Sequence, residues 1–181
     1  FRFINDATNN TIKNTIVEGA NNSSTSGVIL FSTAASGVLG NSSNLITNCD
    51  IRVRSDATGV PVNTIYSSGT AGFPNASNTI SNSNIFNWSG SGVLVSATGV
   101  GNTWTVSGNN FYQTAARTST LIALSIQGGN AHSILNNFIG GSTAADPTHQ
   151  SSVSGVTTWT WGIDNSVTSP TADPWVLSQG T

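Results

Sequence analysis

One five-residue phrase recurs at a fixed interval in the first half of the chain. It reads NTIKN at residues 10–14, NLITN at residues 44–48 and NTISN at residues 78–82. The leading asparagines are 34 residues apart in both steps. A repeat period of 20–50 residues is typical of solenoids, in which each repeat can bury its apolar side chains only against its neighbours. The interval therefore predicts a stack of similar coils.

The residues between the phrases favour β-strands over helices. Ser, Thr, Asn and Gly are spread along the chain without sustained helical spacing of apolar residues, and Ser, Thr and Asn favour turns over helix interiors. Looser copies of the phrase lie at residues 102–106 and 132–140. More apolar runs alternate with the phrases, at residues 27–31, 63–66, 92–95, 121–126 and 155–159. We therefore expect an all-β parallel solenoid of about five coils with loop insertions over residues 1–165, followed by an irregular tail or cap at 166–181.

Equivalent positions of successive coils should stack into columns. The expected inward column of the Asn phrase is Ile12, Ile46 and Ile80, continued by Val106 and Ile134. The expected inward column of the apolar runs is Leu30, Ile65, Val95 and Leu124. A third column, Asn14, Asn48 and Asn82, is expected at the bends, because Asn tolerates left-handed backbone geometry and stacked amides can bond one another.

The same interval pairs several charged and aromatic side chains. It places Glu18 beside Arg52, with Phe86 at the next position, and Arg54 beside Trp88, where a cation–π contact would form. The alternative is that these are solvated surface groups that contribute little stability. In either case Glu18 and Arg52 test the alignment of the coils.

Aromatic side chains provide the best candidates for a binding surface. Phe31 and Tyr66 flank residues expected to point inward, and several tryptophans lie near the ends of runs, so these rings are expected to face outward. The candidate surface-contact residues are Phe31, Tyr66, Trp88, Trp159 and Trp161. The alternative is that they cover the ends of the core.

The composition argues against several classes of partner. Charged residues make up 7% of the chain and Lys plus Arg number five, so strong binding to nucleic acid or to anionic membranes is not expected. No apolar run reaches the roughly 18 residues of a membrane span, so membrane insertion is not expected either. Cys49 has no second cysteine to bond with and is expected to be an inert, partly buried thiol.

Catalytic or metal chemistry finds little support in the residues. Glycoside hydrolysis needs two carboxylates about 5–10 Å apart, and Asp50 and Asp56 are the nearest such pair, although Asp56 lies in a turn-like stretch. Residues 78–145 contain no acid. His132 and His149 lie far apart and neither lies near Cys49, so no metal ion or other cofactor is expected. No residue is therefore assigned a catalytic role, and a polysaccharide lyase or glycosidase remains an alternative.

Three segments of the sequence resemble a known family. NTIKNTIVEGANNSSTSGVILFST, NTISNSNIFNW and NNFIGG resemble coils of right-handed parallel β-helices of the pectate-lyase-like superfamily. More narrowly, they resemble repeat modules of large secreted surface proteins of Bacteroidetes-type bacteria. The resemblance implies an extracellular or cell-surface module, usually embedded in a longer chain. It carries no catalytic residue over to this chain.

Together these observations predict a structural or adhesive module. Its expected partners are further copies of itself or neighbouring repeats of a longer chain, which would build a fibre or stalk. The alternative function is binding or cleavage of a polysaccharide along one face of the β-helix.

Overall fold

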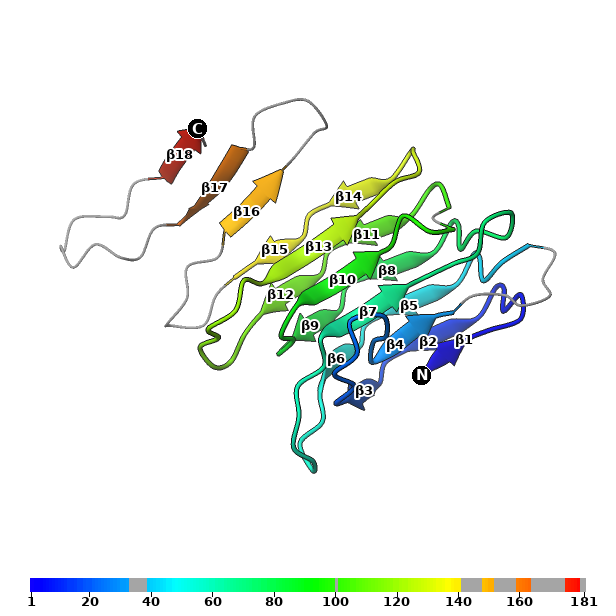
Figure 1. Ribbon diagram of the computed structural model, residues 1–181, viewed down its shortest axis with the longest axis horizontal. Helices are drawn as coiled ribbons and strands as arrows, with labels where there is room; N and C mark the ends of the chain where they lie inside the picture. The colour runs from blue at the N-terminus through cyan, green and yellow to red at the C-terminus, as the bar shows by residue number, and fades with distance from the viewer. Residues whose placement is uncertain (33–38, 100, 141–147, 152–158, 164–174, 180–181) are drawn as a thin grey trace.

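The computed structural model describes residues 1–32, 39–99, 101–140, 148–151, 159–163 and 175–179; for the last three segments the backbone pairing alone is described. These residues form three parallel sheets, here called sheets A, B and C, and one antiparallel sheet, sheet D (Figure 1).

Each parallel sheet contains five short strands. Sheet A consists of β1 (Arg2–Phe3), β4 (Ile29–Phe31), β7 (Asn63–Ser67), β10 (Ser91–Val95) and β13 (Ile122–Ile126). Sheet B consists of β2 (Thr11–Lys13), β5 (Leu45–Thr47), β8 (Thr79–Ser81), β11 (Thr105–Ser107) and β14 (Ser133–Leu135). Sheet C consists of β3 (Ile16–Gly19), β6 (Asp50–Val53), β9 (Asn84–Phe86), β12 (Asn110–Tyr112) and β15 (Phe138–Ile139).

The chain contributes one strand to sheet A, one to sheet B and one to sheet C in each coil. Each strand therefore pairs in parallel with the strand three places further along the chain, one coil away. This confirms the parallel β-solenoid. The stack makes about four complete turns, from β1 to β13, and β14 and β15 begin another. Five turns were expected because the run at residues 155–159 was assigned to a fifth coil.

The described part of that run belongs to a different sheet. Trp159 begins β17 (Trp159–Ile163), which pairs antiparallel with β16 (Thr148–Ser151) and with β18 (Trp175–Gln179) to form sheet D. β16 and β17 lie within the range 1–165 expected to be β-helix, and β18 lies within the range 166–181 expected to be tail. The division of the chain at residue 165 stays a prediction.

The inward column of sheet B follows the repeat interval. Ile12 pairs with Ile46 and Ile46 with Ile80, and the column continues through Val106 to Ile134. The three middle members are completely buried. This is the register that the 34-residue interval predicts, because the phrase occupies the same position in each coil.

The register of sheet A differs from the expected one. Ile29, Ile65, Val93 and Leu124 share one column. Leu30 instead pairs with Tyr66, and Val95 pairs with Ser67 and Ile126. The prediction was therefore wrong by one residue for Leu30 and by two for Val95. A one-residue shift moves a side chain to the opposite face of a strand, whereas a two-residue shift keeps it on the same face, and Val95 is indeed buried.

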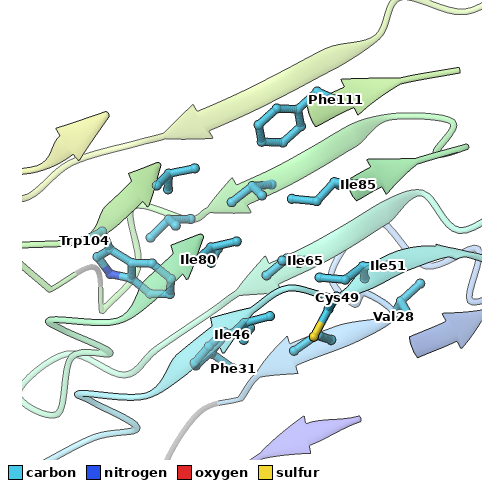
Figure 2. Packing of buried hydrophobic residues seen from close by; sticks show 14 of the residues in the cluster. Val28, Phe31, Ile46, Cys49, Ile51, Ile65, Ile80, Ile85, Trp104 and Phe111 are labelled. Carbon is cyan, nitrogen blue, oxygen red and sulfur yellow. The ribbon is translucent and has the colours of Figure 1, made fainter. Parts of the chain in front are cut away.

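The core between the sheets is apolar and partly aromatic (Figure 2). Phe31 stacks on Phe3 with ring centroids 4.5 Å apart and meets the edge of Trp104 at 5.2 Å. Trp104 is completely buried, and its indole Nε1–H donates to the backbone carbonyl of Asn75 at 2.8 Å. The thiol of Cys49 is buried in this core, close to the carbonyl oxygens of Thr47 and Ile12. Cys49 is 2% exposed, so it is more completely buried than the partly buried thiol expected from the sequence.

Candidate functional site: the side-chain ladders and the terminal coils

The aromatic residues expected to form a contact surface are buried where the structure describes them. Phe31 is 1% exposed, Trp88 3% and Tyr66 7%. Phe31 points into the core because the strand register differs from the expected one, and Trp88 packs edge-on against Phe111. These three predictions were therefore wrong. The side chains of Trp159 and Trp161 lie outside the described residues, so their role stays a prediction.

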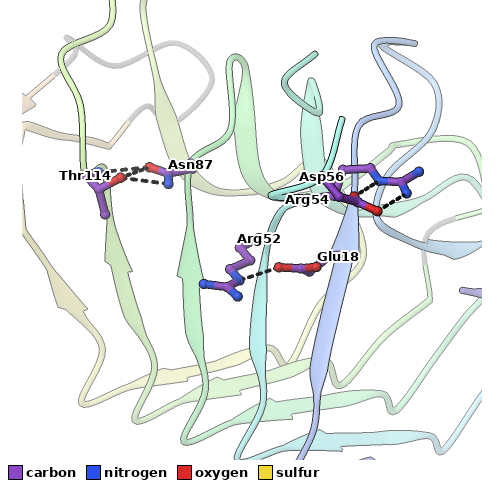
Figure 3. Close-up of polar contacts among 6 residues, drawn as sticks. All are labelled: Glu18, Arg52, Arg54, Asp56, Asn87 and Thr114. Carbon is purple, nitrogen blue, oxygen red and sulfur yellow. Dashed lines mark hydrogen bonds and ion pairs between the residues drawn. The ribbon is translucent and has the colours of Figure 1, made fainter. Parts of the chain in front are cut away.

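A column of interacting side chains runs along the outer face of sheet C. Glu18 and Arg52 occupy paired positions on β3 and β6, and the Nε–H of Arg52 donates to Oε1 of Glu18 at 2.8 Å (Figure 3). This pairing confirms the predicted alignment of the first two coils. The ion pair lies on the surface, so it contributes less than about 1 kcal/mol.

The same column continues through two aromatic rings. The guanidinium carbon of Arg52 lies 5.7 Å from the ring centroid of Phe86, which pairs with it across β6 and β9. Phe86 in turn stacks on Tyr112, with centroids 4.7 Å apart and an interplanar angle of 8°. One face of Phe86 therefore meets Arg52 and the other meets Tyr112. Both faces of Phe86 are used within the chain, so this ring is not free to stack on a sugar.

The cation–π contact was predicted for the wrong arginine. Arg54 does not reach Trp88, which is buried; instead its Nε–H and NH2 group donate to the two carboxylate oxygens of Asp56 at 2.7 and 2.8 Å (Figure 3). This bidentate pair holds the loop after β6. The repeat interval does not predict this pair, because Arg54 and Asp56 are close in the same coil, whereas the interval relates residues of different coils.

A second column of sheet C is polar in its middle. The amide of Asn84 donates to Oδ1 of Asp50 at 2.8 Å, and the amide of Asn110 donates to Oδ1 of Asn84 at 2.9 Å. The two ends of this column are Ile16 and Phe138. The column thus changes from polar to apolar at the first and last coils.

Buried amide groups connect the coils at the corner before sheet B. Oδ1 of Asn44 accepts the backbone N–H of Asn10 at 3.0 Å, and Oδ1 of Asn78 accepts the backbone N–H of Asn44 at 2.9 Å. The side-chain Nδ2 groups of Asn10 and Asn44 donate to the same two oxygens. Each asparagine therefore binds the main chain of the preceding coil through its side chain. This satisfies backbone N–H groups that the strands leave unpaired at the corner.

The histidine His132 takes over this function at the far end of the ladder. Trp104 is the equivalent of Asn78 in the next coil, and its backbone N–H donates to Nδ1 of His132 at 3.2 Å. Since Nδ1 accepts, the imidazole proton is on Nε2, which lies 2.8 Å from the carbonyl oxygen of Gly128. His132 is thus a structural residue that replaces an asparagine.

A parallel ladder follows the corner between sheets B and C. The backbone N–H of Cys49 donates to Oγ of Ser83, that of Ser83 to Oδ1 of Asn109, and that of Asn109 to Oδ1 of Asn137. These donor–acceptor distances are 3.0–3.1 Å. Side-chain oxygens of each coil again accept from the coil before it.

The asparagines expected to form an amide ladder have a different function. Asn14, Asn48 and Asn82 have φ angles of 54°, 53° and 48°. They adopt the left-handed geometry predicted for the bends, while the amide ladder runs through Asn10, Asn44 and Asn78. The next coil has Gly108, with φ 66°, at the place of Asn82. Glycine and asparagine are the residues that tolerate this geometry best.

All four carboxylates among the described residues take part in structural contacts. Oδ1 of Asp6 accepts the backbone N–H groups of Leu39 and Gly40, and Glu18, Asp50 and Asp56 are bonded as described above. The hydrogen bond from Arg54 lowers the pKa of Asp56 below its usual value. The part of the chain that the structure describes holds no group of three or more His, Cys, Asp or Glu side chains that could bind a metal ion.

Exposed large apolar side chains concentrate in the first and last coils. Those in the first coil (residues 1–19) and those in the last coil (residues 122–139) account for every one among the described residues except Leu39; they are Phe1, Ile4 and Ile16 in the first coil and Ile122, Ile134, Leu135 and Phe138 in the last. Within the described part of the chain, no further strand pairs with the outer edges of these coils. The terminal coils are therefore the strongest candidate for an interaction site.

Comparison with known proteins identifies no relative: no protein-family model, curated protein or solved structure matches the chain. The described residues also contain no helix long and apolar enough to cross a membrane.

Proposed function

We propose that this chain is a structural and adhesive module of an extracellular or cell-surface protein, built into a fibre or stalk. The observation that carries the proposal is the use of functional side chains as connections between coils. Carboxylates, amides, an imidazole and an arginine–aromatic column all serve the stack, and the exposed apolar residues gather at its ends. A rod of stacked coils gains rigidity from such ladders.

The finer assignment rests on the resemblance of the Asn phrases and of NNFIGG. They resemble coils of the pectate-lyase-like superfamily and of surface proteins of Bacteroidetes-type bacteria. The cell-surface location and the adhesive role come from that resemblance. The β-solenoid architecture is compatible with them and with other functions, because fold does not fix function.

Polysaccharide cleavage is the alternative, and the carboxylates of the described residues argue against it. A glycosidase needs one carboxyl group with a raised pKa as its acid, whereas Asp56 has a lowered pKa and is held by Arg54. Asp50 accepts a hydrogen bond from Asn84. Stacking of a sugar on Phe86 is also disfavoured, since Arg52 and Tyr112 cover the faces of its ring.

The test combines a cleavage assay with a binding assay. The purified chain is incubated with polygalacturonate and with neutral glucans, and chain length is followed by size-exclusion chromatography. We expect no shortening of either polymer. Cleavage that is lost in Asp50→Asn would overturn the structural function. Binding without cleavage would identify a polysaccharide as the adhesive target. Asp50→Asn should then still bind the polymer, because Asp50 would have no catalytic function.

A further inference from the structure

We propose that copies of this chain stack head to tail, with the last coil of one copy seated on the first coil of the next. The inference rests on the proposed structural function and specifies its partner and its register. It starts from the unpaired strand edges. β1, β2 and β3 pair with strands on one side, and β13, β14 and β15 pair with strands on the other side. Unpaired edges of this kind are templates for additional strands.

The hydrogen-bonding groups at the two ends are complementary. In the ladder before sheet B, backbone N–H groups donate to side chains of the following coil, as Asn10 does to Asn44 and Trp104 to His132. The ladder is interrupted at Trp104, whose indole has no acceptor and itself donates to the carbonyl of Asn75. Stacking would continue this rule, since the backbone N–H of His132 would donate to Oδ1 of Asn10 in the next copy. Neither group has a hydrogen-bond partner among the described residues.

The second ladder continues in the same way. Asn137 ends the series that runs through Ser83 and Asn109. Thr15 occupies the position of Cys49 in the first coil, because Ile16 pairs with Asp50. In a stack of copies the backbone N–H of Asn137 would donate to the hydroxyl of Thr15, as the N–H of Cys49 does to the hydroxyl of Ser83.

The outer columns complement one another at the same ends. The column of Asp50, Asn84 and Asn110 is polar inside the stack, but it ends in Ile16, which is 56% exposed, and in Phe138, which is 67% exposed. Stacking in register places Phe138 beside Ile16 of the next copy. Leu135 would likewise lie along the aliphatic part of Lys13, its counterpart in the first coil. Burial of these side chains supplies the driving force for association.

The charges permit this arrangement and the symmetry predicts its product. Residues 122–139 contain no Asp, Glu, Lys or Arg, so the last coil presents no charge that would repel those of the first coil. Both complementary surfaces belong to this chain, which makes a second copy the partner. A head-to-tail contact that does not close into a ring generates an open filament.

Engineered disulfides test the register directly. Ile16→Cys with Phe138→Cys would place two cysteines opposite each other on neighbouring strands, at a spacing of about 4.8 Å that a disulfide can bridge. We expect mild oxidation to produce a series of dimers, trimers and longer species on a non-reducing gel. The matched control is Ile16→Cys with Leu135→Cys, whose cysteines would belong to different sheets; we expect it to stay monomeric. Cys49 is buried and present in both variants.

Sedimentation velocity of the unmodified chain over a range of concentrations gives the noncovalent counterpart. We expect Ile16→Arg to weaken association at least tenfold and Leu39→Arg, at an exposed apolar residue of a loop, to leave it unchanged. Circular dichroism checks that both variants stay folded. A chain that is monomeric at all concentrations, with no disulfide series, would overturn head-to-tail stacking and leave the structural function in place. A single Ile16→Cys variant that forms dimers would show head-to-head contact and would also overturn it.

Discussion

Oδ1 of Asn78 accepts two hydrogen bonds from Asn44, at 2.9 Å from its backbone nitrogen and at 3.1 Å from its side-chain Nδ2. Both residues are almost completely buried. The same relationship joins Asn10 to Asn44. The asparagine that opens each phrase is thus a connector between coils, and the repeat interval is the distance between connectors.

Removal of this connector should destabilise the stack. Asn78→Ala leaves the backbone N–H of Asn44 buried without its acceptor, which we expect to cost about 2–3 kcal/mol of unfolding free energy. Urea unfolding followed by circular dichroism measures the loss. Asn22→Ala, at an exposed loop position, is the control and should change stability by less than about 0.5 kcal/mol. Equal effects of the two substitutions would show that the ladder contributes nothing specific.

The stability of variants at Asn48 should depend on how well the new residue tolerates the left-handed backbone geometry of this bend. Asn48→Gly should be nearly neutral, because Gly108 has this role in a later coil. Asn48→Val should cost about 1–3 kcal/mol, since a β-branched residue is strained at φ near 53°. Melting temperatures compare the two variants, with Thr11→Val on the exposed face of β2 as a control for β-branching itself. A Val variant as stable as the Gly variant would contradict the assigned strain.

The column on sheet C should show two separable couplings. A double-mutant cycle between Glu18 and Arg52 should give less than about 1 kcal/mol and should decline as salt is added. A cycle between Arg52 and Phe86, with Phe86→Leu, should give about 0.5–1 kcal/mol. If both coupling energies were zero, the column would be a register marker without energetic weight.

Asp56 should contribute to the way the free energy of unfolding falls at acidic pH. Its folded-state pKa is lowered, chiefly by the hydrogen bond from Arg54, so the unfolded chain binds the proton more tightly. The resulting stabilisation is present above the unfolded pKa near 3.8 and is lost as pH falls through the folded pKa. In NMR titrations we expect Arg54→Gln to raise the pKa of Asp56 toward 3.8, whereas Arg52→Gln should leave it unchanged. A pKa that is insensitive to Arg54 would contradict the assigned cause.

Prediction from the sequence succeeded in the strands that the Asn phrase itself marks. The interval of 34 residues places Ile12, Ile46 and Ile80 in one column and Glu18 beside Arg52, and the structure has both. It failed in sheet A, where Ile29 and Ile65 are 36 residues apart although they share a column. The loops that lead from sheet C into sheet A and from sheet A into sheet B differ in length between these coils, so the Asn phrase cannot define the register of Leu30.

The candidate site was predictable in kind but not in its residues. Exposed apolar residues at the open ends of a solenoid follow from the architecture alone, because a terminal coil lacks one neighbour. The surface assignment was wrong for Phe31, Tyr66 and Trp88, which are buried, and stays a prediction for Trp159 and Trp161. The places of Trp104 and His132 in the ladder were not predicted, because these residues stand where other coils have asparagine and the repeated sequence does not mark them.

By itself the sequence determined that coils stack in parallel, which residues begin each coil, and that charged residues make up only 7% of the chain. These properties depend on periodicity and composition, which are local and additive. Tertiary structure decided which oxygen accepts which N–H between coils, which arginine meets an aromatic ring, and which strand edges have no partner among the described residues. Those contacts join residues about 26–34 positions apart, and their geometry exists only once the intervening loops have closed.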